Sequence, residues 1–298
     1  MGLFSKKKLF DKTFLLDDKS LLFKNCINFS YSNIYNDNYV VQGFTISRDY
    51  CMISAYNKFK AKSRIYLYEK NGVFKKYVDL DNSAHVGGIA YDYINDIVFV
   101  TGSWGVINAY SYPELIGGNV ARIECNLDIS KVISGVTSAA TIYFYDNKLY
   151  ACTFEGIGKM VVFDLDISKN KVKVVNEELI NNLPSAIQGI CVFKHNDKLY
   201  YLFSQSFSRL HSIIKLFDDS FNFLGQYKLK EIGLEGIDID YSGNICGVFE
   251  NGIDRTRKVH LSDIVQSRSN MLDKKYYTKG VYFQEKLVNL KEKVWKKW

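Results

Sequence analysis

The chain has 298 residues, a formal net charge of +7 and many aromatic residues, with 22 Tyr and 20 Phe. Only 2 Pro occur, which excludes proline-rich linkers, and the charge is not patterned as in disordered chains. The positive charge forms neither a basic face nor a recognisable module, so we do not expect nucleic-acid binding. Segments in which apolar and polar residues alternate favour an all-β fold.

Residues 1–35 precede the first clear repeat. The opening segment "MGLFSKKKLFDKTFLLDD" carries positive charge but lacks the apolar run of a signal peptide, and no segment approaches a transmembrane span. We therefore expect a cytoplasmic protein. The segments "KTFLLDD" and "LLFKNCINFSYS" are candidate strands that would close a ring by pairing with the C-terminal part of the chain.

From residue 36 to residue 265, a pattern of short strands repeats. A polar residue ends each second strand, at steps of 47, 52, 51 and 46 residues: Ser54, Thr101, Thr153, Ser204 and Glu250. The first strands of the repeats are "QGFTIS" (42–47), "GGIAYD" (87–92), "AATIYFYD" (139–146), "QGICVF" (188–193) and "EGIDID" (235–240). Four short strands at this period are the signature of a β-propeller blade. We predict a single propeller domain.

Third and fourth strands follow in each of the first four repeats. The third strands are "RIYLYE", "VINAYSY", "MVVFDLD" and "IIKLFDD", and the fourth are "FKKYVDLD", "ARIECNLD", "KVKVVNEE" and "FLGQYKL". We predict five four-stranded blades. An alternative is a sixth blade built from both ends of the chain, with "KKYYTKGVYF" as one strand. A Gly follows Gln42, Gln188 and Glu235 because first strands crowd around the axis, where a side chain would collide with its neighbour.

The six cysteines show no metal-like spacing. Four of them lie inside apolar strand patterns: Cys51, Cys152, Cys191 and Cys246. We predict that they are buried free thiols, which is typical of a reducing compartment.

The repeat resembles bacterial propellers of the broad NHL, streptogramin-lyase and SMP-30 type, and more narrowly propellers with a "HVGGIA" first strand, here His85 to Ala90. The resemblance covers about three quarters of the chain. It implies a ligand site at one mouth of the central channel but no particular reaction. The SMP-30 type places several carboxylates and Asn on the axis to hold a divalent metal. Only Glu235 matches here, and Gln42 and Gln188 stand at the equivalent positions.

The starts of the first strands and the ends of the second strands should converge near the axis. The candidate catalytic residues are His85, Glu235 and Glu250, because an imidazole can act as a base and two close carboxyls shift each other's pKa. The candidate ligand-binding residues are Gln42, Gln188, Ser206 and Arg209. For the two Gln, the alternative is a structural amide that satisfies buried backbone groups. For His85 it is a bond to a backbone carbonyl, and for Arg209 a surface ion pair.

Local motifs for metals, nucleotides and serine nucleophiles are absent from the sequence, including HExxH, GxSxG, the Walker loop and the dinucleotide fingerprint. We predict no cofactor and no metal site from the residues. A divalent cation on the axis is the alternative that the resemblance implies.

Residues 266–298 form a tail that leaves the β pattern. Within it, Phe283, Leu287, Leu290, Val294 and Trp298 make an apolar stripe at helical spacing, surrounded by lysines. We predict a short amphipathic helix. It either packs on the propeller or rests on an anionic membrane or a protein partner, with Lys6 to Lys8 adding charge.

These observations favour a propeller that binds a small polar or anionic molecule, or a peptide, at the channel mouth. One alternative is a propeller hydrolase or lyase that uses His85 with Glu235 or Glu250. Another is a protein-interaction scaffold at the periphery of a membrane. The sequence leaves open whether any reaction is catalysed.

Overall fold

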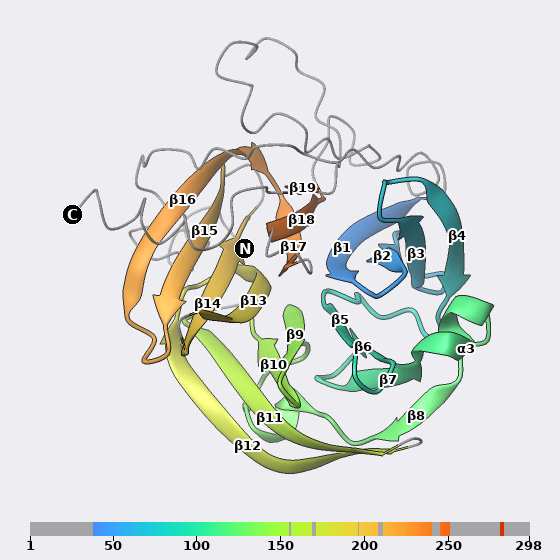
Figure 1. Ribbon diagram of the computed structural model, residues 1–298, viewed down its shortest axis with the longest axis horizontal. Coiled ribbons are helices and arrows are strands. Elements are labelled where there is room, and N and C mark those ends of the chain that lie inside the picture. The colour runs from blue at the N-terminus through green and yellow to red at the C-terminus, as the bar shows by residue number, and fades with distance from the viewer. Residues whose placement is uncertain are drawn as a thin grey trace.

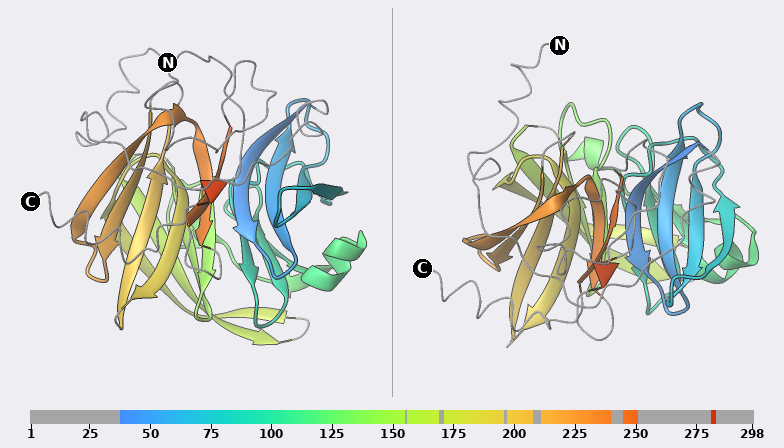
Figure 2. Two further views of the ribbon diagram at one scale, coloured as in Figure 1. Left: turned by 45° about the horizontal axis from the view of Figure 1, so that its top comes forward. Right: turned by 90° about the horizontal axis from the view of Figure 1, so that it is seen from above.

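The computed structural model describes residues 38–154, 156–168, 171–195, 197–207, 211–239, 245–250 and 281–282. Within these ranges the chain is almost entirely β, apart from helix α3 (Tyr112–Gly117) and the 3-10 turn η3 (Ile129–Lys131). The sheets stand around a central axis, with their strands running between two faces of the ring (Figures 1 and 2). The predicted all-β propeller is confirmed.

Four blades each have four described strands. The first has β1 (Tyr39–Ile46), β2 (Tyr50–Asn57), β3 (Arg64–Glu69) and β4 (Phe74–Asp79). The second has β5 (Ile89–Asp92), β6 (Ile97–Thr101), β7 (Ile107–Ser111) and β8 (Arg122–Cys125). The third has β9 (Thr141–Tyr145), β10 (Lys148–Cys152), β11 (Gly158–Ser168) and β12 (Lys171–Leu183). The fourth has β13 (Ile187–His195), β14 (Lys198–Gln205), β15 (His211–Asp218) and β16 (Phe223–Ile232). All of these strands overlap the predicted segments.

The fifth blade contains β17 (Leu234–Ile239), β18 (Ile245–Phe249) and β19 (Val281–Tyr282). β19 pairs antiparallel with β18, so part of the segment assigned to a sixth-blade alternative adds to the fifth blade here. The N-terminal candidate strands lie outside the described residues, and five blades against six stays a prediction. The second and third blades are joined, because β12 pairs in parallel with β8 at Lys171 and Val172 (Figure 1).

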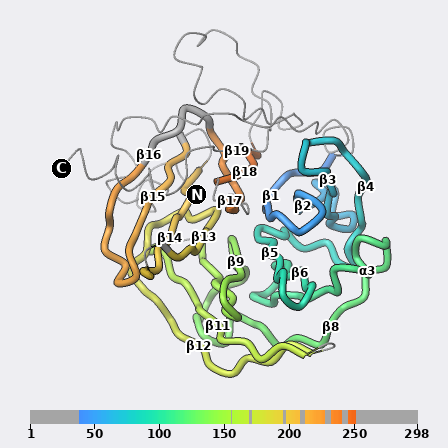
Figure 3. The backbone as a smooth tube through the Cα atoms, in the orientation of Figure 1, coloured from blue at the N-terminus to red at the C-terminus, as the bar shows by residue number. Residues whose placement is uncertain are grey.

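The first strands β1, β5, β9, β13 and β17 surround the axis (Figure 3). Neighbouring first strands approach so closely that glycine is required between them. A Cβ atom at Gly236 would lie 2.4 Å from the Phe44 backbone nitrogen, so β17 packs directly on β1. A Cβ atom at Gly43 would lie 3.0 Å from the Ile89 backbone nitrogen. The predicted reason for the Gly after Gln42 and Glu235 is confirmed.

A hydroxyl group of the second strand, opposite the glycine of the first strand, ties each of the first two blades together. Thr101 ends its strand as predicted, whereas β2 continues beyond Ser54 to Asn57. Ser54 Oγ accepts a hydrogen bond from the Gly43 backbone N–H at 2.9 Å and donates to the Val86 carbonyl at 2.8 Å. In the second blade, Thr101 Oγ1 accepts from the Gly88 N–H at 2.9 Å. In these two blades, the polar residue of the second strand therefore satisfies a backbone N–H group of the first strand.

In the third and fifth blades, the strand register places another residue than the predicted polar one at the equivalent position of the second strand. Cys152, not Thr153, lies opposite Thr141 in the third blade. In the fifth blade Gly247 pairs with Ile237, which puts Val248, not Glu250, opposite Gly236. The sequence assignment was wrong at both places because a polar residue follows one or two positions beyond the strand position that faces the inner glycine.

Replacing Ser54 with alanine should lower the free energy of unfolding by about 2 kcal/mol, because the Gly43 N–H and the Val86 carbonyl both lose a buried partner. Denaturant unfolding would measure the loss. Ser83→Ala is the matched control, since Ser83 is exposed on the loop before β5. Equal stability of the two variants would contradict a structural role for the Ser54 hydroxyl.

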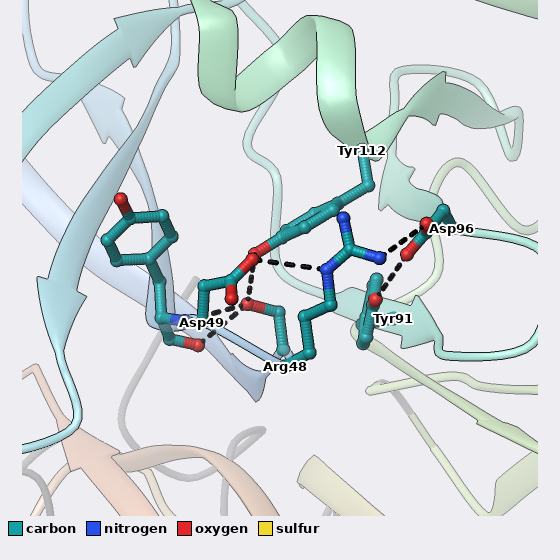
Figure 4. Close-up of polar contacts among 7 residues, drawn as sticks. Arg48, Asp49, Tyr91, Asp96 and Tyr112 are labelled. Atoms are coloured by element: carbon teal, nitrogen blue, oxygen red, sulfur yellow. Dashed lines mark hydrogen bonds and ion pairs between the residues drawn. The ribbon is translucent and has the colours of Figure 1, made fainter.

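At the face of the ring where the first strands end, polar side chains join the first and second blades (Figure 4). Arg48 Nη1 lies 2.7 Å from Asp96 Oδ2, and its guanidinium stacks over the Tyr112 ring at 5.2 Å from the centroid. The Tyr112 hydroxyl donates to Asp49 at 2.9 Å, and the Tyr91 hydroxyl donates to Asp96 at 2.6 Å. This cluster holds the two blades together from their turns.

Helix α3 was not predicted, because Tyr112 was assigned to the end of a third strand. Pro113 stands in the first turn, and Gly118 ends the helix at a φ of 98°. Both residues are helix-end signals that were available in the sequence. The predicted C-terminal amphipathic helix lies outside the described residues.

The cysteines predicted to be buried are buried: Cys51, Cys152, Cys191 and Cys246. They are free thiols, as is Cys125. Burial raises the pKa of Cys191 well above its usual range, with a smaller contribution from Asp238. These thiols therefore behave as small apolar groups in the core.

Candidate functional site

We call the face at which the first strands begin the upper face. There, the end of β14, the start of β17 and the end of β18 bring three predicted residues together. Ser206 Oγ donates to Glu235 Oε1 at 3.5 Å, and the Glu235 and Glu250 carboxyls are joined by a hydrogen bond. Ser206 and Glu235 are buried, whereas Glu250 is half-buried. Residues from two blades thus form one polar cluster.

Burial raises the pKa of Glu235 well above its usual range, and the charge and hydrogen bond of Glu250 raise it further. The Ser206 hydroxyl opposes this shift. Two carboxyls so close cannot both ionise at low cost, so the pair holds one proton between them near neutral pH. This proton lies in the hydrogen bond between the two carboxyls, so the pair offers its remaining oxygens as acceptors.

Gln205 precedes Ser206 in the chain, with its side chain on the opposite side of β14, and was not singled out from the sequence. Its side chain is fully buried, and Nε2 donates to the Ser185 carbonyl. Its Oε1 accepts no hydrogen bond within the described residues. A buried acceptor without a donor is uncommon and calls for an explanation. The available signal was its place between Ser204 and Ser206, at the end of an apolar strand.

Gln42 and Gln188 lie at the same level of the ring, each at an irregularity of its first strand. Gln42 is buried, and its Nε2 donates to the Val41 carbonyl at 2.8 Å. This contact fits the structural alternative for Gln42. Gln188 is half-buried, and no hydrogen bond within the described residues joins it to the carboxyl pair.

His85 lies on the upper face, in the loop before β5. Its imidazole stacks on the Tyr56 ring with the centroids 4.4 Å apart and 25° between the planes. Although the residue is exposed, desolvation by its neighbours lowers the pKa of His85, so the ring is neutral near neutral pH. Within the described residues no carboxyl bonds to His85, and Glu235 and Glu250 belong to another blade. Arg209 lies outside the described residues.

A second buried carboxyl, Asp238, lies nearer the opposite face. It accepts hydrogen bonds from Thr45 Oγ1 at 2.8 Å, from the Ile46 N–H at 2.7 Å and from the Ile239 N–H at 2.6 Å. The Tyr143 hydroxyl of β9 also bonds to it. Burial raises the pKa of Asp238 to about 6, while these donors oppose the shift.

Tyr143 thereby bridges two first strands that are not neighbours in the ring, since β13 lies between β9 and β17 (Figure 3). The aromatic ring of Tyr143 packs against the buried apolar residues of the neighbouring strands. The sequence signal for Asp238 was an acid inside the first strand "EGIDID", between two apolar residues.

Within the described ranges, no three His, Cys, Asp or Glu side chains are grouped so that they could hold a metal ion. In the same part of the chain, none of the helices has the length and apolar character needed to cross a membrane.

No family model matches the sequence, and no curated protein matches it. Solved structures with a similar fold include the WD40 β-propeller domain of Doa1, at 12% identity over 78% of this chain and 79% of that chain, with a TM-score of 0.41. A structure of U3-55K is similar at 8% identity over 78% of this chain and 79% of that chain, with a TM-score of 0.45. A nidogen–laminin complex matches at 15% identity over 71% and 70% of the two chains, with a TM-score of 0.41.

Proposed function

We propose that this propeller is a binding protein that recognises a ligand rich in N–H groups, either a peptide segment or a small amide or amine. The ligand contacts the upper face between the fourth and fifth blades. The observation that carries this proposal is the set of acceptor oxygens of Ser206, Glu235 and Glu250. The buried Gln205 Oε1 without a donor lies one residue away, on the other side of β14. An unused acceptor and a carboxyl pair together suit a donor-bearing ligand.

The same cluster argues against the anionic part of the predicted ligand class. A carboxyl pair that holds one proton still carries one negative charge, which repels phosphate and carboxylate groups. Arg209, the residue predicted to hold an anion, lies outside the described residues. We therefore propose a neutral or cationic ligand.

The enzyme alternative needs His85 to act with Glu235 or Glu250, and the geometry offers it less support. His85 stacks on Tyr56 in the loop that leads into the second blade, whereas both carboxyls belong to the fifth. The finer resemblance to NHL, streptogramin-lyase and SMP-30 propellers likewise stays a proposal.

The test screens the full-length protein against a tripeptide library with free and acetylated amino termini, by ligand-observed NMR, and then measures affinity by calorimetry. We expect Ser206→Ala and Glu235→Ala to weaken binding by at least about tenfold, because a buried partner is lost from the complex. The matched control is Glu178→Ala, an exposed carboxyl on β12. Affinity that is equal in all three variants would refute the site.

The pH dependence distinguishes the two ligand classes. Because the pKa of Glu235 is raised, its proton is lost only at pH values well above those at which an ordinary Glu ionises. A neutral amide that donates an N–H to the pair should bind with an affinity that changes little as the pH rises through that range. An ammonium group should bind more tightly, since both carboxyls become charged.

A further inference from the structure

Three large apolar side chains stand on the upper face with little protein around them. Phe59 is 77% exposed, Trp104 is 75% exposed and Ile157 is 67% exposed. Each lies in the loop between the second and third strands of its blade, in the first, second and third blades respectively. Equivalent loops of a propeller open on one face, so the three tips share that face. We call them the apolar tips.

Hydrogen bonds fix the backbone at two of these tips. In the first loop, the Phe59 N–H donates to Asn57 Oδ1 at 2.8 Å and the Lys60 N–H donates to the Asn57 carbonyl at 3.1 Å. In the second, Trp104 has a φ of 60°, a left-handed conformation that is unfavourable for so large a residue. It is held there by Gly105, whose N–H donates to the Thr137 carbonyl at 2.8 Å.

The charge beside the first tip is positive. Lys58, Lys60 and Lys62 are exposed on the same loop as Phe59, and none forms an ion pair within the described ranges. Two acids, one at the end of β4 and one in the connection that follows it, are already engaged. Asp79 pairs with Arg64 at 2.7 Å, and Asp81 pairs with Arg122. The loop that carries Phe59 therefore has a net positive charge.

We infer that the apolar tips and the three lysines dock the propeller on the surface of an anionic membrane. Tryptophan and phenylalanine on loop tips insert at the boundary between headgroups and acyl chains, and lysines beside them bind anionic headgroups. This surface lies on the first three blades, whereas the carboxyl cluster belongs to the fourth and fifth. Both lie on the upper face but share no residue, and the docking surface does not depend on the proposed function.

A lipid surface fits these residues better than a protein partner does. The core of a protein interface is usually one contiguous patch in which apolar groups pack against each other. Here the apolar groups come from three loops, and each is exposed over at least two thirds of its surface. Separate apolar tips beside lysines suit insertion into a continuous apolar phase.

The experiment is flotation of the full-length protein with vesicles of phosphatidylcholine, with and without phosphatidylserine. We expect binding that requires phosphatidylserine and weakens with salt. Phe59→Ser and Trp104→Asn should each weaken it about tenfold. Replacing Lys58, Lys60 and Lys62 together with glutamine should weaken it by about a hundredfold. Asn is chosen at position 104 because it tolerates a positive φ.

The control variants are Tyr93→Ser and Ile94→Ser. Both residues are 61% exposed, and they lie on the turn between β5 and β6, on the face opposite the apolar tips. They should float like the unmodified protein. Three results would overturn the inference: no binding to either vesicle, equal binding by all variants, or equal losses on both faces. Equal binding by all variants would move the membrane contact to another part of the chain, including its basic tail.

Discussion

Replacing Gly236 with alanine is expected to lower the free energy of unfolding by about 3 kcal/mol or more, or to prevent folding. The added Cβ atom would lie 2.4 Å from the Phe44 nitrogen, 2.9 Å from the Phe44 Cβ and 3.0 Å from the Gly43 carbonyl carbon. Two of these atoms are backbone, so no side chain can rotate away to make room. The strain would fall where β17 meets β1, between the first and the last of the described blades.

Gly117→Ala is the matched control for this substitution. Gly117 is the last residue of α3, and an added Cβ would meet no atom within 4 Å. Alanine favours helix over glycine, so this variant should be as stable as the parent or more stable by up to about 1 kcal/mol. Thermal and denaturant unfolding of both variants measure the difference. A Gly236→Ala protein as stable as Gly117→Ala would show that β17 does not pack on β1 as described.

The blade pattern could be predicted from the sequence because each blade repeats the same local requirements. A glycine is required where first strands meet, as at Gly43, and an apolar second strand follows at a regular interval. These requirements depend on neighbours at a constant sequence separation. The prediction was wrong where a blade lacks a polar residue at this position. Cys152 and Val248 stand at the positions for which Thr153 and Glu250 were predicted.

The polar cluster could be predicted only in part. Glu235 was identifiable because it precedes a first-strand glycine, a position that the repeat places where first strands meet. Gln205 was missed because its importance depends on an unfilled hydrogen bond, which no sequence pattern records. Asp238 was missed because its donors come from strands of three different blades, including Thr45 and Tyr143. Whether side chains from different blades meet depends on the directions in which they point, and the spacing of residues in the sequence does not specify these directions.

Replacing Asp238 with alanine is expected to lower the free energy of unfolding by about 2–4 kcal/mol at neutral pH. The N–H groups of Ile46 and Ile239 point at its carboxyl and cannot turn elsewhere. The hydroxyls of Thr45 and Tyr143 can rotate, so they contribute less. Thr45→Val is the matched comparison. It removes one donor and leaves the carboxyl in place, and it should cost about 1 kcal/mol.

The cost of Asp238→Ala should also depend on pH in a defined direction. Burial raises the pKa of Asp238 from 3.8 to about 6, so between those pH values the folded chain keeps a proton that the unfolded chain has lost. The stability that this group contributes is complete at about pH 4 and falls as the pH rises through 6. A shift of about two pKa units corresponds to about 3 kcal/mol. The alanine variant lacks this dependence, so the stability difference from the parent should be larger at pH 4 than at pH 7. Denaturant unfolding of both proteins across this range gives the difference directly, and ionisations that the two proteins share cancel. A difference that grows with pH would mean that the four donors stabilise the ionised carboxylate by more than burial penalises it.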